Sequence, residues 1–346
     1  MTMHYIGTTF PPTSQWHQDE KTLIQSIHQQ IDQQFPNHSN LFINSTWFGP
    51  QFDNGEYQKF QALVEQKKKF DNVFLLAAAD PVFLNHEQIQ KIIDDVSASN
   101  LFLLGHFDSP YNFNFHSFVI PNYFEQYNNN ELMLKTPTNI FLNYNRKPRD
   151  HRIELVNKLF ENNLQNLGII TLGESNNVYN RSNLSSVPLN LQETPNKGNW
   201  GMSMEFGIPH DIHSLGNIDI WQSCFLNVVG ETEFFPWDHT FVSEKTWKPI
   251  IGLRPFVVNG QSKIYAWLRD NGFKTFNHHW PHIEIEDIPE YEVHNSIVSL
   301  IKYISSLSET DIKNLYQEML PDLVYNRNKF FEFGREQKYK TEHLFG

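Results

Sequence analysis

The first third of the chain alternates short apolar runs with polar segments in which apolar residues recur every three or four positions. That spacing predicts amphipathic helices over Glu56–Lys69 and His86–Ser97. The apolar runs around these helices are typical of buried strands and comprise Leu41–Ile43, Val73–Ala77 and Leu101–Leu104. Strands that alternate with helices in this way predict βαβ units and a parallel sheet.

The same alternation restarts after a polar stretch that opens at Asn128 and ends at Thr138. Further strands are predicted at Ile140–Leu142, Gly168–Leu172, Phe225–Val229, Pro255–Val258 and Phe273–Phe276. Further helices are predicted at Asp150–Leu164, Ser243–Ile251, Lys263–Asn271, Val293–Ser306 and Asp311–Phe333, the last of them bent or broken at Pro321. Residues 174–203 show no apolar period, which is typical of a functional loop or of a disordered segment.

Two successive runs of alternating strands and helices predict an α/β protein with two Rossmann-like domains, each built on its own parallel sheet. We expect the first domain over residues 1–135, the second over 136–310 and a helical tail over 311–346. Ligands bind such folds at the carboxyl ends of the strands, so chemistry is expected in a cleft where the two domains face each other.

Composition excludes several classes of protein. Hydrophobic residues make up 39% of the 346 residues, which is enough for packed cores and excludes disorder over the whole chain. The single cysteine, Cys224, cannot form an intramolecular disulfide or a multi-cysteine metal site, which indicates a reducing compartment. The chain has no apolar run of about 18 residues and no leader pattern at its start, so we expect a cytoplasmic protein without a membrane span.

The balance of charge disfavours a nucleic-acid partner. The formal net charge is -12, from 27 Lys and Arg against 39 Asp and Glu. A negative protein repels polyanions unless its basic residues gather locally, so nucleic acid is an improbable partner but is not excluded. Two local gatherings of basic residues do occur.

The first basic cluster follows the predicted strand Ile140–Leu142 and enters the next helix; it contains Arg146, Lys147, Arg149 and Arg152. A strand, a basic loop and a helix N-terminus together suit an anion, because free backbone N–H groups and the helix dipole act beside the side-chain charges. The alternative is an ordinary solvated turn.

The second basic cluster lies at the predicted helix Ser243–Ile251 and contains Lys245, Lys248 and, after the helix, Arg254. Ser243 is a good N-cap and Glu244 suits the first helical turn. A cation such as Lys245 is disfavoured in that turn by the dipole, so an anionic ligand there would remove a conflict. Glu231, at the end of the preceding strand, is either a partner for ribose hydroxyls or a plain salt-bridge partner.

At these residues the sequence resembles GT-B glycosyltransferases, most nearly the α1,3-fucosyltransferase-like group. The resemblance runs over roughly residues 139–276 and is carried by Phe225–Glu231, then Phe241–Lys245, then Arg254–Gly260. It implies the GT-B architecture, with the acceptor side in residues 1–135 and the nucleotide-sugar donor side in residues 136–310. Together, the resemblance and the basic clusters give a set of expected donor-binding residues. They are Arg146, Arg149, Arg152, Glu231, Ser243, Glu244, Lys245 and Lys248.

Position by position, the resemblance implies that Glu244 binds the donor ribose and that Lys245 and Arg152 bind the diphosphate. A departing diphosphate gains negative charge that the enzyme must neutralise. The chain has no Asp-x-Asp motif, so Arg152 and Lys245 would supply the positive charge without a metal ion, and no cofactor is expected.

The resemblance also implies a base from the N-terminal domain that deprotonates the acceptor hydroxyl. Candidates at the ends of predicted strands are Asp80, His106 and Asp108. Asp80 and Asp108 are equally good turn starters, because a proline follows each of them closely.

Other motifs in the sequence do not change this expectation. His278, His279 and His282, and His210 with His213, could suggest a metal, but they lack the metalloprotease glutamate and a cysteine, so surface or packing roles are expected. His279 could also lie near the sugar of a donor. P-loop, dinucleotide-binding and nucleophile-elbow motifs do not occur in the sequence.

The sequence therefore predicts a metal-independent glycosyltransferase that uses a nucleotide-sugar donor, with a GDP-sugar favoured, and a glycan or other hydroxyl acceptor. Two alternatives stay open. One is a non-catalytic carbohydrate-binding or structural protein on a transferase-like fold, and the other is a glycosyltransferase that acts on modified DNA bases.

Overall fold

A computed structural model describes the chain over residues 4–6, 15–44, 56–77, 86–105, 112–113, 124–127, 130–145, 148–172, 204–205, 208–209, 215, 218–234 and 240–345. By their internal contacts the residues form two compact units. Unit 1 comprises Met1–Val119 together with Gly334–Gly346, and unit 2 comprises Ile120–Phe333. The division at residue 119 precedes the boundary expected at 135, and the end of the C-terminal tail belongs to unit 1.

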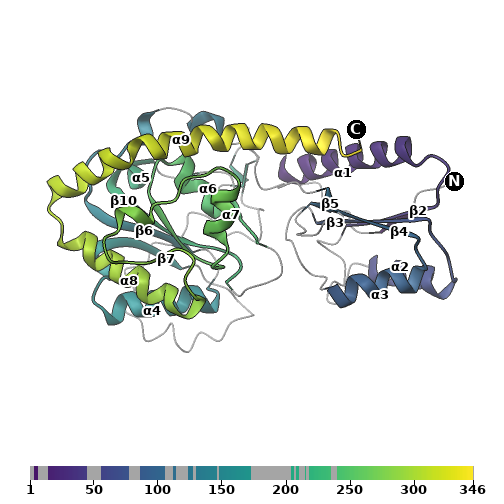
Figure 1. Cartoon of the computed structure of the whole chain (residues 1–346), viewed down its shortest axis with the longest axis horizontal. Coiled ribbons are helices and arrows are strands. Elements are labelled where there is room, and N and C mark those ends of the chain that lie inside the picture. The colour runs from purple at the N-terminus through teal and green to yellow at the C-terminus, as the bar shows by residue number, and fades with distance from the viewer. Residues whose placement is uncertain are drawn as a thin grey trace. The chain divides into compact units, whose positions relative to one another are not determined.

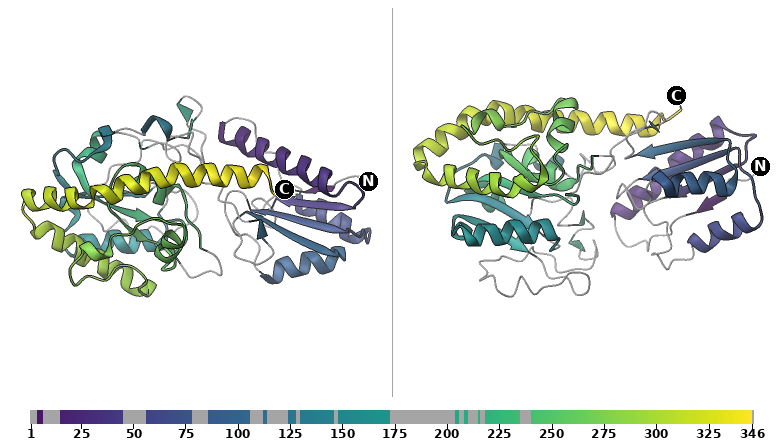
Figure 2. Two further views of the ribbon diagram at one scale, coloured as in Figure 1. Left: turned by 45° about the horizontal axis from the view of Figure 1, so that its top comes forward. Right: turned by 60° about the horizontal axis from the view of Figure 1, so that its bottom comes forward.

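Unit 1 is built on a parallel sheet with the strand order β1-β2-β3-β4-β5. Its strands are β1 (His4–Ile6), β2 (Asn40–Asn44), β3 (Asn72–Ala77), β4 (Asn100–Gly105) and β5 (Asn112–Phe113). Its helices are α1 (Gln15–Gln34), α2 (Glu56–Glu65) and α3 (His86–Val96). Figures 1 and 2 show α1 on one face of this sheet and α2 and α3 on the other.

The two faces of the unit 1 sheet are apolar because successive side chains of a strand point to opposite sides. Phe42 and Phe74 point towards α1, where they pack with Ile27 and Ile31. Their neighbours in sequence pack against α2 and α3 in a second cluster that includes Leu41, Ile43, Val73, Leu75, Phe60 and Ile92. A sheet buried on both faces accounts for the near-continuous apolar runs of these strands.

Unit 2 is built on a second parallel sheet with the order β11-β10-β6-β7. Its strands are β6 (Asn139–Asn145), β7 (Gly168–Leu172), β10 (Cys224–Gly230) and β11 (Phe256–Asn259), and a short pair is formed by β8 (Met204–Glu205) and β9 (Ile208–Pro209). Its helices are α4 (Asp150–Glu161), α5 (Ile218–Ser223), α6 (Glu244–Ile251), α7 (Ile264–Asp270), α8 (Glu290–Ser306) and most of α9 (Glu309–Glu342). The 3₁₀ turns are η3 (Glu125–Tyr127), η4 (Asn130–Leu132), η5 (Gln165–Leu167) and η7 (Asn277–His279).

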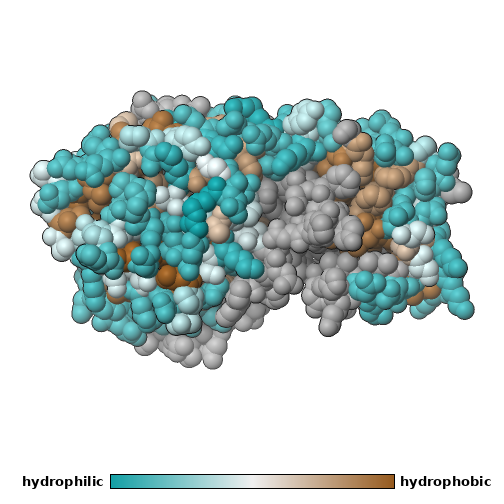
Figure 3. All heavy atoms as spheres, viewed as in Figure 1, coloured by the Kyte–Doolittle hydropathy of each residue, from teal (hydrophilic) through white to brown (hydrophobic). Residues whose placement is uncertain are grey.

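Helices cover both faces of the unit 2 sheet. In Figure 1, α4 and α8 lie on one side of it, and α5, α6 and the first part of α9 lie on the other. Trp247 of α6 is fully buried and packs against Phe273 and against Phe330 and Phe333 of α9. In Figure 3 the visible face of unit 2 is mostly hydrophilic, with apolar residues in small separate groups.

The prediction of an α/β protein with parallel sheets and C-terminal helices is confirmed. Apart from Phe273–Phe276, every predicted strand is present, with bounds that shift by a few residues at most. The helix predicted over Glu56–Lys69 ends at Glu65, because the chain turns at Lys67, whose φ of 51° lies in the left-handed region. The predicted loop over residues 174–203 lies outside the described residues.

The strand predicted at Phe273–Phe276 is wrong. Both phenylalanines are buried, but the segment pairs with no strand among the described residues. The N–H of Phe273 donates to the carbonyl of Leu268 at 2.9 Å, and that of Phe276 donates to the Glu286 carboxylate at 3.0 Å. The amide of Asn326 accepts from the N–H of Lys274 at 2.8 Å and donates to its carbonyl at 2.8 Å. The segment therefore has the apolar pattern of a buried strand and a backbone held by α9.

The C-terminal helices also differ from expectation. Helix α9 runs unbroken through Pro321 and extends past Phe333 to Glu342, so a break at this proline is wrong. Helix α1 was not predicted, because its apolar residues are diluted by glutamine and histidine. Each helix in the described part of the chain is too short or too polar to cross a membrane.

Candidate functional site

The N-termini of helices α4 and α6 lie close to the end of strand β10. Glu231 and Thr232 follow β10 directly, and the side chains of α4 and α6 that carry positive charge reach these two residues. The carboxyl ends of parallel strands are where α/β proteins bind ligands. This group of residues, here called the β10 site, lies within unit 2.

Glu231 is the anchor of the β10 site. Its side chain is fully buried, and its two carboxylate oxygens accept from the backbone N–H groups of Thr232 and Ser243, at 2.9 and 3.0 Å. They also accept from the hydroxyls of Ser243, at 2.6 Å, and Thr246, at 2.7 Å. The carboxylate therefore acts as an internal anion at the N-terminus of α6, where the helix dipole favours negative charge.

Lys245 is held in the first turn of α6 by the groups around Glu231. Its ammonium donates to the Glu244 carboxylate at 2.6 Å, to the Thr232 hydroxyl at 3.1 Å and to the Ser243 hydroxyl at 3.2 Å. Ser243 caps the helix by accepting from the Lys245 N–H, as its sequence predicts. The unfavourable position of this cation is thus compensated by carboxylates of the chain itself.

Two arginines at the start of α4 reach the same two residues. Arg152 is buried and its guanidinium donates to the carbonyl of Glu231 at 2.7 Å. Arg149, just before α4, donates to the carbonyl of Thr232 at 2.5 Å and pairs with Glu233 at 3.4 Å. Gly230 permits this approach, because a Cβ there would lie 2.2 Å from Oδ1 of Asn145 and 3.3 Å from Nε of Arg152.

A pair of buried histidines lies beside the arginines. Nε2 of His151 lies 2.9 Å from the carbonyl of Glu231, so this nitrogen carries the proton of the neutral ring. His151 stacks on Phe234, which stacks on His294 from α8. Burial, followed by the charge of Arg152, lowers the pKa of His151 to about 3, and burial lowers the pKa of His294 to about 4.

Exposure distinguishes the cations that a ligand could reach from those that support them. The side chains of Arg149 and Lys245 are each 27% exposed, whereas Arg152 and Glu231 are buried. Arg149 is also the N-cap of α4, where the helix has no side-chain cap hydrogen bond. An anion that entered here would meet two half-exposed cations, a helix N-terminus and the Thr232 hydroxyl.

The β10 site brings together most of the predicted donor-binding residues: Arg149, Arg152, Glu231, Ser243, Glu244 and Lys245. Lys248 is half-buried and lies about one turn further along α6. Arg146 and the candidate bases Asp80, His106 and Asp108 lie outside the described residues. Thr232 and His151 were not predicted as site residues. Thr232 directly follows Glu231, and His151 lies between the two arginines in sequence, so both positions carried a signal.

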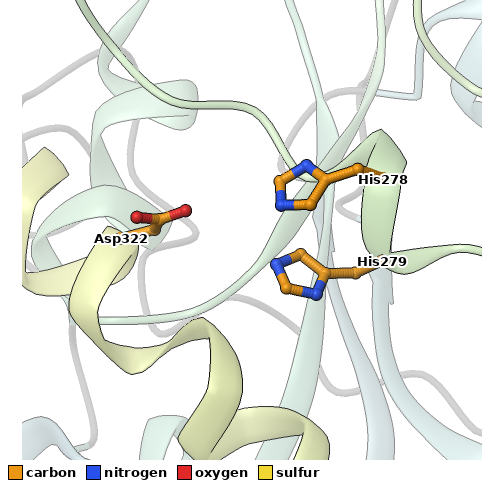
Figure 4. A group of neighbouring side chains, drawn as sticks. All are labelled: His278, His279 and Asp322. Carbon is orange, nitrogen blue, oxygen red and sulfur yellow. The ribbon is translucent and has the colours of Figure 1, made fainter.

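Three residues of unit 2 could hold a metal ion. His278 and His279, on η7, lie close to Asp322 of α9 (Figure 4). His282, which the sequence groups with them, is exposed and has a left-handed backbone, with φ of 62°. His210 and His213 lie outside the described residues. Asp322 is more than 40 positions from the two histidines, so spacing along the sequence could not indicate that it lies beside them.

Comparisons with protein-family models, with curated proteins and with solved structures find no significant match to this chain.

Proposed function

We propose that this protein is a glycosyltransferase that moves a sugar from a nucleoside diphosphate donor, a GDP-sugar in first place, to a hydroxyl acceptor. The observation that carries the proposal is the convergence of Arg149, Arg152 and Lys245 on Glu231 and Thr232. A leaving diphosphate needs neutralisation of its growing charge, and fixed cations beside a helix N-terminus supply it.

In this proposal the donor exchanges partners with the acidic residues of the β10 site. Lys245 and Arg149 are paired with Glu244 and Glu233. A diphosphate would take over both cations, and Glu244 would then be released to accept from ribose hydroxyls. Glu231 keeps its structural role, because its carboxylate oxygens already accept hydrogen bonds from Thr232, Ser243 and Thr246.

The proposal extends to the GT-B arrangement, with the donor bound by unit 2 and the acceptor by a second α/β domain across a cleft. Asp80, His106 and Asp108 are the candidate bases that would deprotonate the acceptor hydroxyl. The chemistry assigned to the β10 site needs no metal ion.

Nucleotide-dependent stabilisation tests the proposal. A ligand that binds only the folded protein raises its melting temperature, so GDP is expected to stabilise the chain, and UDP or other diphosphates to do so less. Charged hydrogen bonds contribute about 1.5 to 3 kcal/mol each, so Arg149→Ala and Lys245→Ala should each weaken GDP binding about ten- to a hundredfold. Lys263→Ala, at an exposed lysine of α7's N-cap, is the matched control and should bind as the unsubstituted chain does.

A second measurement separates catalysis from binding. Release of GDP from a GDP-sugar should fall about ten- to a hundredfold in Lys245→Ala, with the folded state checked by its melting curve. An unsubstituted chain whose melting temperature no nucleoside diphosphate changes would contradict the proposal and favour the non-catalytic alternative. Steeply salt-dependent binding to duplex DNA would instead favour a modified DNA base as the acceptor.

A further inference from the structure

A second polar cluster of unit 2 is formed by His278, His279 and Asp322. One possible ligand atom from each residue lies within 4.8 Å of the other two. Figure 4 shows both imidazole rings, which come from the 3₁₀ turn η7, directed towards the Asp322 carboxylate, which comes from α9. The two ring centroids are 4.1 Å apart, so the imidazoles of these adjacent residues lie next to each other.

The position of these rings is set by the backbone of the turn. The Glu286 carboxylate accepts from the N–H groups of Phe276 and Asn277, at 3.0 and 2.9 Å. The Asn277 side chain in turn bonds to Glu284 and to the N–H of Ile285. The turn is therefore held by contacts that do not involve the imidazoles, and it presents them to α9.

His279 has a buried nitrogen that lacks a partner. Its Nε2 atom has no hydrogen-bond partner within the described part of the chain. A neutral imidazole nitrogen has a lone pair that a metal ion can accept. A buried polar atom without a partner costs free energy, which a bound cation would remove.

We propose that His278, His279 and Asp322 bind a divalent transition-metal ion of the Zn²⁺ class. Two imidazole nitrogens and one carboxylate oxygen form a ligand set that suits zinc. Ligand atoms around a tetrahedral zinc ion lie about 3.4 Å apart, so modest side-chain rotation closes the site from its present separation. Glu318 lies one turn earlier on α9 and is exposed, so it adds negative charge to the same helix.

Lys274 competes with the metal ion. Its ammonium lies 2.5 Å from Oδ1 of Asp322 and 5.0 Å from the ring centroid of Tyr325. The ammonium supplies the positive charge that this carboxylate would otherwise receive from the metal. Because the Lys274 side chain is 47% exposed, it can move into solvent when the metal ion binds. Metal binding is thus expected to be an exchange of one cation for another.

Cobalt titration tests the proposal on the full chain. The protein is first treated with a chelator, and the chelator is removed. CoCl₂ is then added while the visible absorption of protein-bound Co²⁺ is followed. Finally, ZnCl₂ is added to displace the bound Co²⁺. The unsubstituted chain is expected to bind one ion at this site. His278→Ala, His279→Ala and Asp322→Asn should each weaken binding about tenfold or more, and Lys274→Met should strengthen it.

The matched control is His282→Ala, which removes an exposed histidine close in sequence to the cluster and should bind Co²⁺ as the unsubstituted chain does. Melting curves without metal show whether each variant is folded. Asp322→Asn, a change of nearly equal size at a half-buried residue, keeps the test valid if His279→Ala unfolds. The chain has 16 histidines, so binding of equal strength in all variants would place the ion elsewhere and overturn the proposal. Absence of binding by the unsubstituted chain would overturn it too. Neither outcome bears on nucleotide-dependent stabilisation.

Discussion

Glu231 shows how a single residue decides what the β10 site can do. A glutamate at the end of a strand suggests a ligand contact when only the sequence is known. In the structure its carboxylate is fully buried and accepts from Ser243, Thr232 and Thr246, so it joins the end of β10 to the start of α6. The function of Glu231 is therefore to position its neighbours, and the accessible charged groups are those of Lys245 and Arg149.

Residue types at strand ends were enough to predict which part of the chain forms the site, but not the role of each residue. Arg149 and Arg152 belong to one basic cluster in the sequence, yet one is half-exposed and the other is buried. Arg149 lies at the N-cap of α4, whereas Arg152 lies within the helix and makes the close approach that Gly230 allows. Such packing depends on three elements at once, and spacing along one element does not show it.

The two buried histidines predict a loss of stability in mild acid. Unfolded histidines titrate near pH 6.5, whereas the pKa values of His151 and His294 in the folded chain are about 3 and about 4. Between these values the unfolded chain binds more protons, so stability is complete above about pH 7 and falls as the pH drops towards 4. At pH 5 the loss is about 2 kcal/mol for each histidine. Urea denaturation of unit 2 at pH 7 and pH 5 measures it.

The source of the acid sensitivity can be checked with His294→Gln. Glu154 lies 3.5 Å from Nδ1 of His294, but its carboxylate is 65% exposed and does not offset the burial of the ring. The variant should therefore show a smaller difference in stability between pH 7 and pH 5. His343→Gln, at an exposed histidine, should leave that difference unchanged. Equal pH dependence in the His294 variant and the unsubstituted chain would show that the buried ring is protonated in the folded state.

At the scale of elements, apolar runs predicted strands well where the strands pair with each other. The runs of β3 and β10 are buried on both faces, which leaves a clear signal in the sequence. Phe273–Phe276 has the same signal, but the side chains of Asn326 and Glu286 form backbone hydrogen bonds there that a neighbouring strand would otherwise form. Hydropathy reports burial of side chains and does not report where backbone hydrogen bonds go.

An asparagine ladder at the start of three strands supports a prediction for the sheet of unit 1. Asn72 of β3 donates to Asn40 of β2 at 2.8 Å and accepts from Asn100 of β4 at 3.0 Å. Asn72 is 1% exposed, so Asn72→Ala would leave buried amide groups without partners and cost about 1 to 3 kcal/mol. Hydrogen–deuterium exchange of peptides from β2, β3 and β4 measures the change.

Asn100→Ala is the comparison for the ladder, because Asn100 is exposed and water can replace its hydrogen bonds. Its effect should stay within about 0.5 kcal/mol. Equal exchange rates in Asn72→Ala and Asn100→Ala would mean that the ladder adds no stability beyond that of the paired strands.

At the scale of the whole molecule, the two ends of the sequence form one unit. Residues 334–346 belong to unit 1, although unit 2 separates them from it in sequence. The side chain of Gln30 on α1 donates to the carbonyl of Thr341 and accepts from the N–H of Leu344, both at 2.8 Å. Phe345 packs edge-on against Phe35, with ring centroids 5.5 Å apart. A boundary read along the chain could not show this return, because sequence order carries no signal of it.

Leu344 therefore stabilises strands that lie far from it in sequence. It is 6% exposed and belongs to the apolar cluster that contains Ile27, Phe42 and Phe74. Leu344→Ala should cost about 2 kcal/mol or more, because it removes buried methyl groups and leaves a cavity against the sheet. Hydrogen exchange should accelerate in peptides from α1, β2 and β3, while peptides from β6 and β10 of unit 2 keep their rates. Lys340→Ala, at an exposed residue near the end of α9, should change neither set. If the Leu344 variant instead accelerates exchange in β6 and β10, or in no strand, the C-terminal residues do not contribute to the core of unit 1.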